Sequence, residues 1–566
     1  MNSETKQCQN CKNDFTIEPE DFVFYEKIQV PPPTWCPECR FQRRLTFLNF
    51  RNLYKRTCGL CKKDAISAYS PDKHVNVYCS KCWWSDDWDP RDYGRDYDFS
   101  RPFFTQYSEL LREAPVIGIS IDIPTFNTSP YTHHAGELKN CYLLFFADYC
   151  QDSAYGFGIS HNTSCFDCSV TAYSEQCYDS MHSFKNNGCV GLRSQVTNSI
   201  DSFFLRDCNN CHNCFGSANL YNASYVFFNK QLTKEAYKEK LASIDLGSYT
   251  EYRKLQTAVE SHWNTLPPKP VVNQFVQDCT GSYVFESKNC KECFEVVDGE
   301  DSKFIWNSYK VRDCYDISNW GENLTESYEC SNVGTESTHL KFCFEAGLGT
   351  LDAEYCKLST GGKYHFGCVS VRKPEYCILN KQYTEEEYEE LVPKIKEHMN
   401  SMPYVDAQGR IYRYGEFFPP ELSLFAYNES IANDFFPLSK EEIEAQGFSY
   451  KKYEKSQHSI TTKAGTLPDH IKDVTDSILK EVIECDRCSN GFRIISMELG
   501  FLKNRNLPLP RQCPMCRIKE KYDLWIKNLR MIPRTCDKCD AEFITKYTKE
   551  EAPHMLCKDC YLKEFV

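Results

Sequence analysis

From about residue 139 onward the chain consists of short repeat units. Each unit has a cysteine or serine at a recurring position and a strand-length run of aromatic or β-branched residues. In the first half these units include CQDSAYGFGIS, CFDCSVTAYS, CYDSMHSFK and CVGLRSQV, which start at Cys150, Cys165, Cys177 and Cys189. Units this short cannot bury an apolar face alone, so they are expected to stack as a parallel β-solenoid. Two units per coil would give coils of roughly 22–25 residues.

The same signature returns in a second half, at Cys279, Cys290, Cys314, Cys343, Cys356 and Cys368. Both halves also end alike, because residues 214–237 match residues 365–388 at a constant offset of 151. In each copy the last predicted strand is followed by the sequence NKQ and then by a predicted helix, whose N-cap is expected to be Thr233 in the first copy and Thr384 in the second. The sequence therefore predicts two solenoid halves at 139–231 and 271–383, a helical insert at 232–270, and a helix with an irregular linker at 384–478.

Both ends of the chain carry the same series of C-x-x-C pairs, in residues 1–90 and again in residues 479–566. The spacing from the first pair to the second is identical in the two copies, and so is the spacing from the third pair to the fourth. Two such pairs complete one tetrahedral thiolate site, so each end is predicted to be a tandem module with two structural Zn²⁺ sites, four in all. Which pairs share an ion stays open. The predicted ligands are Cys8, Cys11, Cys36, Cys39, Cys58, Cys61, Cys79, Cys82, Cys485, Cys488, Cys513, Cys516, Cys536, Cys539, Cys557 and Cys560.

After Cys36-Pro-Glu-Cys39 the segment RFQRRLTFLNFRNLYKR contains no glycine or proline and is predicted to be a helix. Two ligands at a knuckle and two at a helix N-terminus make the treble-clef arrangement, in which the helix dipole favours thiolates. The alternative for a single C-x-x-C is a redox dithiol. Four pairs at duplicated spacing favour structural zinc, which leaves no open coordination position for catalysis.

The formal charge of the chain is −13 at pH 7, and four filled four-thiolate sites would bring it to roughly −21. Such a charge opposes binding of nucleic acid by the whole surface. Two segments are nevertheless basic, residues 36–62 and 511–538. The predicted nucleic-acid contacts, to RNA rather than duplex DNA, are Arg40, Arg44, Arg51, Lys55, Arg517, Lys521 and Arg534. The alternative is that these cations compensate the anionic zinc–thiolate centres and solvate a helix face.

Further cysteines in the solenoid could bind a zinc ion or an iron–sulfur cluster, and Cys208, Cys211 and Cys214 are the best candidates for such a site. Serine stands in the cysteine positions of other units, for example at Ser199. A metal ligand does not exchange with serine so freely. The favoured interpretation is therefore stacked, reduced cysteine that acts as a small apolar core residue.

The repeat also sets a column of acids, with members at Asp152, Asp167, Asp179 and Asp201. Paired carboxylates on a solenoid face are typical of enzymes that act on sugars. An aspartate at a coil corner also caps its own turn, and this interpretation is favoured. Because the sequence has no nucleophile elbow, phosphate-binding glycine loop or dinucleotide fingerprint, we expect no enzyme activity.

Residues 91–138 are predicted to be a connector, which follows an aromatic and acidic stretch. Trp83, Trp84 and Trp88 are expected to cover a module junction rather than stack on bases, since the aspartates around them would repel phosphate. The N-terminal segment MNSETKQCQN shows no apolar signal-peptide core, and the chain has no apolar run long enough to span a membrane. A cytoplasmic protein without membrane contact is therefore expected.

Several segments carry a resemblance to a known family: CPECRFQRRLTFLNFRNLYKRTC, WDPRDYGRDYDFSRPFF, the NKQ-x-T-x-E-x-Y segments and GEFFPPELS. They resemble uncharacterised large zinc-ribbon proteins of candidate-phyla-radiation bacteria, whose ends look like treble-clef zinc-binding domains. The resemblance covers most of the chain and implies zinc and architecture. It brings no established activity and no catalytic residue.

The sequence thus predicts a multidomain protein of mixed α+β class, with tandem zinc modules flanking a Cys-rich parallel β-solenoid that has helical inserts. The leading functional hypothesis is a non-enzymatic zinc-binding scaffold whose modules contact nucleic acid. A protein–protein adaptor built on an acidic solenoid is the alternative. A carbohydrate-active enzyme of the solenoid face is the third possibility.

Overall fold

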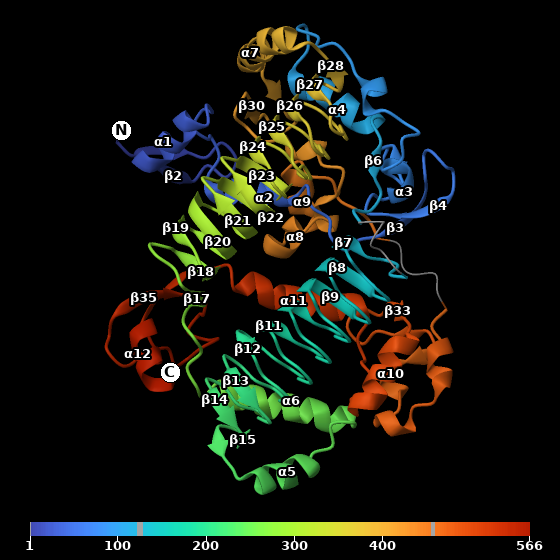
Figure 1. The fold of residues 1–566 in the computed structure, drawn as a ribbon, viewed down its shortest axis with the longest axis vertical. Helices are drawn as coiled ribbons and strands as arrows, with labels where there is room; N and C mark the ends of the chain where they lie inside the picture. The colour runs from blue at the N-terminus through green and yellow to red at the C-terminus, as the bar shows by residue number, and fades with distance from the viewer. Residues whose placement is uncertain (1, 122–127, 454–458) are drawn as a thin grey trace. The chain divides into compact units, whose positions relative to one another are not determined.

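The computed structural model describes residues 2–121, 128–453 and 459–566, which form two compact units. Unit 1 contains residues 1–119 and 273–452, and unit 2 contains residues 120–272 and 453–566. Each unit combines one solenoid half with the cysteine module from the opposite end of the chain (Figure 1). The N-terminal module therefore belongs with the second solenoid half, and the C-terminal module with the first.

The solenoid half of unit 2 confirms the predicted parallel stacking, but its coils are shorter than predicted. Phe166 pairs with Tyr178, and Tyr178 pairs with Val190, so each pairing advances the chain by one coil. The N–H of Cys165 donates to the hydroxyl of Ser153 at the equivalent place in the preceding coil, 12 residues earlier. The prediction of two units per coil is wrong, because each sequence unit closes a whole coil by itself. The strands are β7 (His133–Gly136), β8 (Tyr142–Asp148), β9 (Ala154–Ser160), β10 (Ser169–Ala172), β11 (Met181–Phe184), β12 (Val196–Thr197), β13 (Asn209–His212) and β14 (Tyr221–Ser224).

The short coil is made possible by a corner at every third residue. From Tyr131 to Ser194, every third residue has a left-handed backbone, with φ between +48° and +72°. Each coil consequently has four corners separated by short extended sides. Asp152, Asp167 and Asp179 all occupy such corners, with φ of +48°, +54° and +50°. Aspartate tolerates this conformation better than most residues, which supports the turn interpretation of the predicted acidic column.

The interior of the coil is narrow and is filled by one small side chain after each corner. In one coil these residues are Cys165, Cys168, Thr171 and Ser174, and each is at most 3% exposed. The Cys165 thiol donates a hydrogen bond to the carbonyl of Thr163, two residues earlier. Ser153, one coil earlier, donates in the same way to the carbonyl of Gln151. Cysteine and serine interchange here because both are small and both satisfy the same carbonyl.

The solenoid half of unit 1 is built in the same way, and in both halves the coil length varies by a residue; in unit 2, for example, Asn187 pairs with Ile200, 13 residues later. The N–H of Cys314 donates to the hydroxyl of Ser302, 12 residues earlier, and the N–H of Leu340 donates to that of Ser327, 13 residues earlier. Its strands are β17 (Asn273–Gln274), β18 (Gly281–Phe285), β19 (Lys288–Lys291), β20 (Cys293–Lys303), β21 (Trp306–Arg312), β22 (Tyr315–Thr325), β23 (Tyr328–Gly334), β24 (Thr338–Lys341), β25 (Leu351–Glu354), β26 (Lys363–Phe366) and β27 (Glu375–Ile378).

Both halves end in the same cap, an antiparallel hairpin followed by a helix. The hairpins are β15 (Val226–Phe227) with β16 (Lys230–Gln231), and β27 with β28 (Lys381–Gln382). Helices α5 (Lys234–Ala242) and α7 (Glu385–Ser401) follow them, and α6 (Tyr249–Trp263) follows α5. Thr233 accepts a hydrogen bond from the N–H of Ala236, and Thr384 from that of Glu387. The two predicted N-caps are confirmed.

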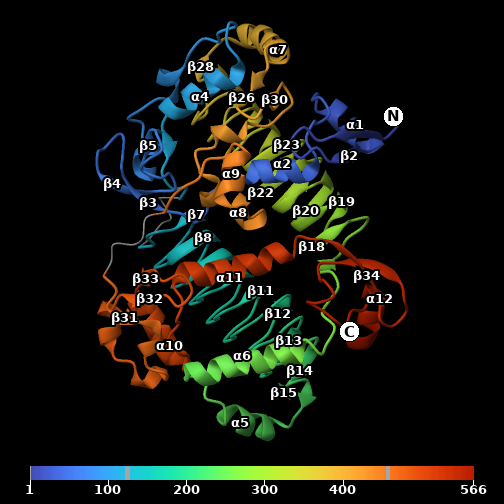
Figure 2. The ribbon, with the colours of Figure 1, turned by 180° about the vertical axis from the view of Figure 1, so that it is seen from behind.

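The two cysteine modules are short hairpins and helices. In unit 1 these are β1 (Glu4–Gln7), β2 (Asp14–Ile17), α1 (Pro19–Lys27), α2 (Pro37–Leu45), β3 (Tyr54–Thr57), β4 (Asp64–Ser67), β5 (Val77–Tyr78) and α3 (Ser80–Trp83). In unit 2 they are β32 (Ile483–Glu484), β33 (Gly491–Phe492), α10 (Ser496–Arg505), α11 (Pro514–Lys527), β34 (Ile532–Thr535), β35 (Glu542–Thr545) and α12 (Lys558–Phe565). Figure 2 shows α11 running along the coils of its own unit, where it contacts β9.

The remaining described segments are connectors within each unit. Those of unit 1 are η1 (Pro90–Tyr93), α4 (Phe103–Glu113), β6 (Val116–Ile117), β29 (Tyr404–Val405), β30 (Ile411–Tyr412), η3 (Pro420–Leu422), η4 (Tyr427–Glu429), α8 (Ala432–Phe435) and α9 (Lys440–Ala445). Those of unit 2 are β31 (Thr462–Lys463), η5 (Ala464–Thr466), η6 (Ile471–Asp473) and η7 (Asp476–Lys480). Parts of the predicted connector and linker, residues 122–127 and 454–458, lie outside the described residues. Among the described helices none has both the length and the apolar content needed to cross a membrane.

The helix predicted after Cys39 is shorter than expected, because α2 ends at Leu45. Phe47, Leu48 and Phe50 then follow as buried residues outside the helix. The Asn49 side chain donates to the backbone carbonyls of Asn52 and Ala68, which competes with helical hydrogen bonding. Tertiary packing thus overrides the local helix preference.

We predict that Cys177→Ser lowers the stability of unit 2 by less than about 1 kcal/mol, because serine makes the same bond to the carbonyl two residues earlier. Cys177→Leu should cost about 1–3 kcal/mol by overfilling the narrow interior. Native-state amide exchange of the coils around Cys177 measures both costs. Equal losses for the two variants would contradict this account of the interior.

Candidate metal centres and their attachment to the solenoid

Among the described residues, four groups of four cysteines lie close enough to hold a metal ion. The ligand atoms within each group lie within 4.8 Å of one another. Each group combines two C-x-x-C pairs that follow one another in the chain, which settles the pairing that the sequence left open. The groups are Cys8, Cys11, Cys36 and Cys39; Cys58, Cys61, Cys79 and Cys82; Cys485, Cys488, Cys513 and Cys516; and Cys536, Cys539, Cys557 and Cys560.

We call the group nearer the start of each module the first site and the other the second site. All four sites begin with the same knuckle at the end of a hairpin. The residue after the second knuckle cysteine has a left-handed backbone, at Lys12, Lys62, Ser489 and Asp540. Its N–H donates to the carbonyl of the first knuckle cysteine at 3.0 Å in every site. The turn therefore brings both knuckle thiols to one side.

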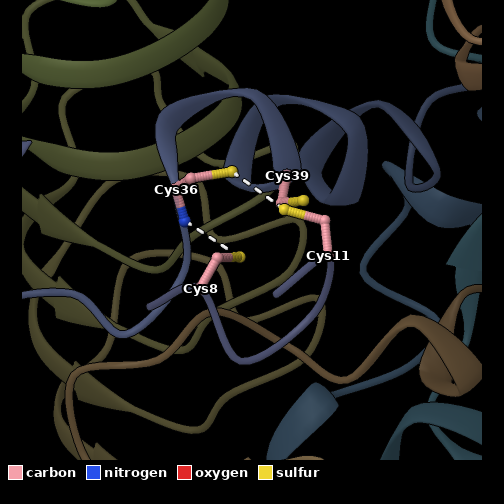
Figure 3. Close-up of side chains that lie close together, drawn as sticks. All are labelled: Cys8, Cys11, Cys36 and Cys39. Atoms are coloured by element: carbon pink, nitrogen blue, oxygen red, sulfur yellow. Dashed lines mark hydrogen bonds between the residues drawn. The ribbon is translucent and has the colours of Figure 1, made fainter. Parts of the chain in front are cut away.

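The second pair of each site lies at the start of a helix. Cys36, Cys79, Cys513 and Cys557 are the N-cap residues of α2, α3, α11 and α12. The N–H of each N-cap cysteine donates to the sulfur of the first knuckle cysteine at 3.2 Å, as Figure 3 shows for Cys36 and Cys8. Backbone donors of this kind stabilise a thiolate at the receiving sulfur.

These donors favour ionisation of the first knuckle cysteine. Burial opposes ionisation of Cys58, yet the backbone N–H groups of Cys79, Cys61 and Leu60 lower its pKa to about 6. The pKa of Cys536 is lowered to about 6 by equivalent N–H groups against the same opposing burial. At the helix side the balance is reversed, since burial raises the pKa of Cys513 to about 12. Filling a site with metal must therefore release protons.

The spacing of the sulfur atoms fits a tetrahedral metal centre. A Zn–S bond of about 2.3 Å implies sulfur atoms about 3.8 Å apart along each edge of the tetrahedron. The Sγ atoms of Cys11 and Cys36 are 3.8 Å apart, and those of Cys488 and Cys513 are 3.7 Å apart. All of these cysteines are free of disulfide bonds. The donor set and its spacing are therefore suited to a thiolate-binding metal.

In unit 1 the helix that starts at the first site is attached to the solenoid through buried ion pairs. Arg40 and Arg44 of α2 both donate to the carboxylate of Asp316, at 2.8 and 2.9 Å. All three side chains are at most 1% exposed. Arg43 bridges Glu329 of the next coil and Glu416, with its guanidinium 4.3 Å from the ring centre of Trp35. Three buried arginines thus face three buried carboxylates.

Unit 2 has a corresponding attachment, with cations at two equivalent positions of its helix. Arg517 and Lys521 stand four and eight residues after Cys513, as Arg40 and Arg44 do after Cys36. Arg517 pairs with Asp167 and Glu498, and Lys521 pairs with Asp179. Like Asp316 and Glu329, Asp167 and Asp179 occupy left-handed corners of successive coils. We call these four acids the corner carboxylates.

The corner carboxylates and the cations that pair with them are buried, so both partners have lost most of their hydration. Burial raises the pKa of Asp167, against the opposing effect of Arg517 and Lys521. For Asp179 burial also opposes ionisation, but Arg193 and Lys521 lower its pKa to about 2. Because this folded-state pKa lies below the ordinary value of 3.8, Asp179 stabilises unit 2 above that value and ceases to do so as pH falls through about 2.

Four of the predicted nucleic-acid contacts, Arg40, Arg44, Arg517 and Lys521, do not lie on an exposed face of the described structure. Their side chains are at most 9% exposed and are paired with carboxylates, so a phosphate backbone cannot reach them. Arg51 pairs with Asp434 at 2.6 Å, while Lys55 is exposed on β3. Arg534 donates to the backbone carbonyls of Tyr547 and Ala552. Neither Arg51 nor Lys55 lies on α2, because that helix ends earlier.

Sequence reasoning missed the partners of these cations. Glu329 and Glu498 lie in no motif, and Glu416 lies in the GEFFPPELS segment, to which the sequence assigned no role. Arg193 lies in the solenoid itself, where it pairs with Asp179 at 3.0 Å. The available signal was the shared offset of cations from the helix N-cap cysteine in both copies, combined with acids at corners of successive coils. The sequence shows both features but does not show that they meet.

Two other sequence alternatives are decided by the structure. Cys208, Cys211 and Cys214 are buried at 1% or less and belong to an apolar cluster, and within the described residues they form no metal-binding group. Trp83 is buried, and Arg372 donates to its carbonyl while its guanidinium lies 5.6 Å from the ring centre. Arg372 also lies 4.8 Å from the ring centre of Trp88, so Trp83 and Trp88 cover a junction between module and solenoid as predicted, whereas Trp84 is 44% exposed.

Comparisons with known proteins give little for this chain. No protein-family model matches it, and no curated protein matches it. Among solved structures, a chain described as a "putative acetyltransferase" from Desulfovibrio desulfuricans G20 is similar, with 11% identity. The match covers 51% of this chain and 74% of that chain, with a TM-score of 0.11. At this TM-score the likeness carries no argument.

We predict that the purified chain binds one metal ion at each of the four groups, and that removing both knuckle cysteines of one group removes one ion. Because binding must displace thiol protons, the apparent affinity should fall as pH is lowered below about 7. Elemental analysis gives the stoichiometry, and competition with a chelator across pH gives the affinity. A pH-independent affinity would contradict the thiolate assignment.

We predict that Arg517→Met lowers the stability of unit 2 by about 3–5 kcal/mol, because it leaves Asp167 and Glu498 buried without their cation. The matched control is Lys254→Ala, which removes an exposed pair with Glu251 and should cost less than about 0.5 kcal/mol. Native-state amide exchange of unit 2 measures both. A cost for Arg517→Met no greater than that of the control would contradict the importance of this pair.

Proposed function

We propose that this protein is a non-enzymatic zinc-binding scaffold that presents its solenoid surfaces to protein partners. The observation that carries the proposal is the burial of the basic helix residues against the corner carboxylates. The strongest sequence argument for nucleic-acid binding depended on these cations. Because these cations are paired with carboxylates inside each unit, we infer that the modules attach to the solenoid rather than to nucleic acid. This inference supports the adaptor hypothesis.

The four cysteine groups are proposed to hold Zn²⁺ in treble-clef sites. Four thiolates at tetrahedral spacing are typical of structural zinc, and zinc bound in this way would fix the knuckle to the helix N-terminus. A full set of four protein ligands leaves no position for a substrate. Two of the four predicted acids of the solenoid, Asp167 and Asp179, are buried in ion pairs with Arg517 and Lys521, which argues against a catalytic role for these two.

The exposed side of the unit 2 solenoid has a feature suited to a protein partner. Tyr149, His161 and Tyr173 stack on successive coils, with ring centres 4.6 and 4.5 Å apart. Tyr149 and Tyr173 are 57% and 59% exposed. Exposed aromatic side chains are enriched in the energetically important parts of protein interfaces.

The first test is binding of the metal-loaded chain to labelled RNA and DNA across a salt series. We expect no binding at micromolar concentration in low salt, because the basic helix residues are occupied. Binding whose affinity falls linearly with the logarithm of salt concentration, with a slope implying several phosphates, would contradict the scaffold proposal.

A second test addresses the exposed aromatic side chains. Site-specific cross-linking should capture a protein partner with the wild-type chain but not with the double variant Tyr149→Ser and Tyr173→Ser. It should be retained by Tyr309→Ser, which changes a tyrosine of unit 1 that is 52% exposed.

A further inference from the structure

We infer that the first site of each module is a metal-dependent latch that controls the attachment of the module to its solenoid half. The inference rests on the metal binding proposed above and goes beyond it, because it assigns different roles to the two sites of a module. In this arrangement the metal holds the helix, the helix holds the buried cations, and the cations neutralise the corner carboxylates.

The covalent path from metal ligand to buried charge is short. Cys513 is both a ligand and the N-cap of α11, and Arg517 and Lys521 follow on the next two turns. In unit 1, Cys36 has the same relation to Arg40 and Arg44 on α2, which spans only nine residues. Isolated helices shorter than about 12–15 residues are marginal in water, so α2 depends on its anchored start and its docking. Loss of the metal therefore loosens the element that carries the cations.

Release of the cations has a direct consequence for the solenoid. The corner carboxylates are buried, and burial without a counter-charge is costly. Asp316 is fully buried, and Asp167 is 4% exposed. When their cations leave, these acids must gain water, which requires the covered side of their coils to open. The corner carboxylates would then form an exposed acidic surface that is hidden in the metal-loaded protein.

The second site of each module lacks this connection. Its helix in unit 2, α12, reaches the solenoid through a neutral hydrogen bond from the Tyr561 hydroxyl to Asn219, at 3.1 Å. In unit 1, α3 is one turn long and its Trp83 packs with Arg372. Neither contact leaves a buried carboxylate without its counter-ion. The two sites of one module therefore serve as matched test and control.

Metal access to the latch is also built in. Cys11 and Cys488, the second knuckle cysteines of the two first sites, are exposed. A competing chelator can therefore approach the metal from the knuckle side, whereas the N-cap cysteines Cys36 and Cys513 on the helix side are buried. The latch would respond to metal availability without prior unfolding of the unit.

The test compares two double variants of the full chain, Cys485→Ser with Cys488→Ser at the first site, and Cys536→Ser with Cys539→Ser at the second. Metal content and amide exchange of residues 165–184 are measured in the same samples. We expect each variant to lose one ion. Exchange in these coils should accelerate by about tenfold or more only in the first-site variant. Equal acceleration in both variants, or none in the first-site variant, overturns the latch.

A third variant separates the electrostatic mechanism from simple loss of folding. Adding Asp167→Asn and Asp179→Asn to the first-site variant removes the charges that release would leave uncompensated. Exchange of residues 165–184 should then slow by about threefold or more relative to the first-site variant alone. Exchange that stays as fast overturns the latch. A wild-type chain without bound metal overturns both proposals, whereas four ions with unchanged exchange in the first-site variant overturns the latch alone.

Discussion

Each unit of this protein depends on a small set of buried charges that join a cysteine module to a solenoid half. In unit 1, Arg40, Arg43 and Arg44 meet Asp316, Glu329 and Glu416. Buried ions are tolerated only when they are paired with good geometry, so the module cannot leave without a large cost to the coils. The pairs therefore specify which surface of the solenoid the helix covers, whatever net stability they add.

The architecture of the coil explains why this attachment sits at corners. A left-handed residue at every third position turns the chain four times in each coil and points its side chain outward. Acids at equivalent corners of successive coils are then one coil apart, so that two of them face the cations of one helix, as Asp167 and Asp179 face Arg517 and Lys521. The inward positions are so confined that cysteine, serine and other small residues fill them. This accounts for the many cysteines that lie outside the four metal-binding groups.

The internal duplication extends beyond the sequence motifs to the interface itself. Arg517 lies 4.7 Å from the ring centre of Tyr155, and Arg40 lies 5.5 Å from that of Phe304. Tyr155 and Phe304 are the corner residues one coil before Asp167 and Asp316. The two copies take their third cation from different elements. In unit 1 it is Arg43 of the helix, and in unit 2 it is Arg193 of the solenoid. The balance of three cations and three anions is kept although the residues that provide it are not.

The sequence by itself determined the features that depend on local chemistry. The C-x-x-C spacing predicted the four cysteine groups, because a knuckle is formed by neighbouring residues. The repeat predicted a parallel solenoid, and Thr233 and Thr384 were found as N-caps because a cap needs only the next turn. The coil length was not predicted, since left-handed corners at residues as different as Leu143, Phe146 and Tyr149 leave no compositional signal.

Only the tertiary structure decided the role of the basic residues. A run of arginines after a metal site has the same sequence signature whether it faces solvent or a carboxylate. Arg40 is separated from Asp316 by 276 residues, and Arg517 from Asp167 by 350. Each module pairs with the solenoid half that is farther from it along the chain. Long-range charge pairing of this kind is invisible to local patterns, because it depends on which surfaces come together when the coils close.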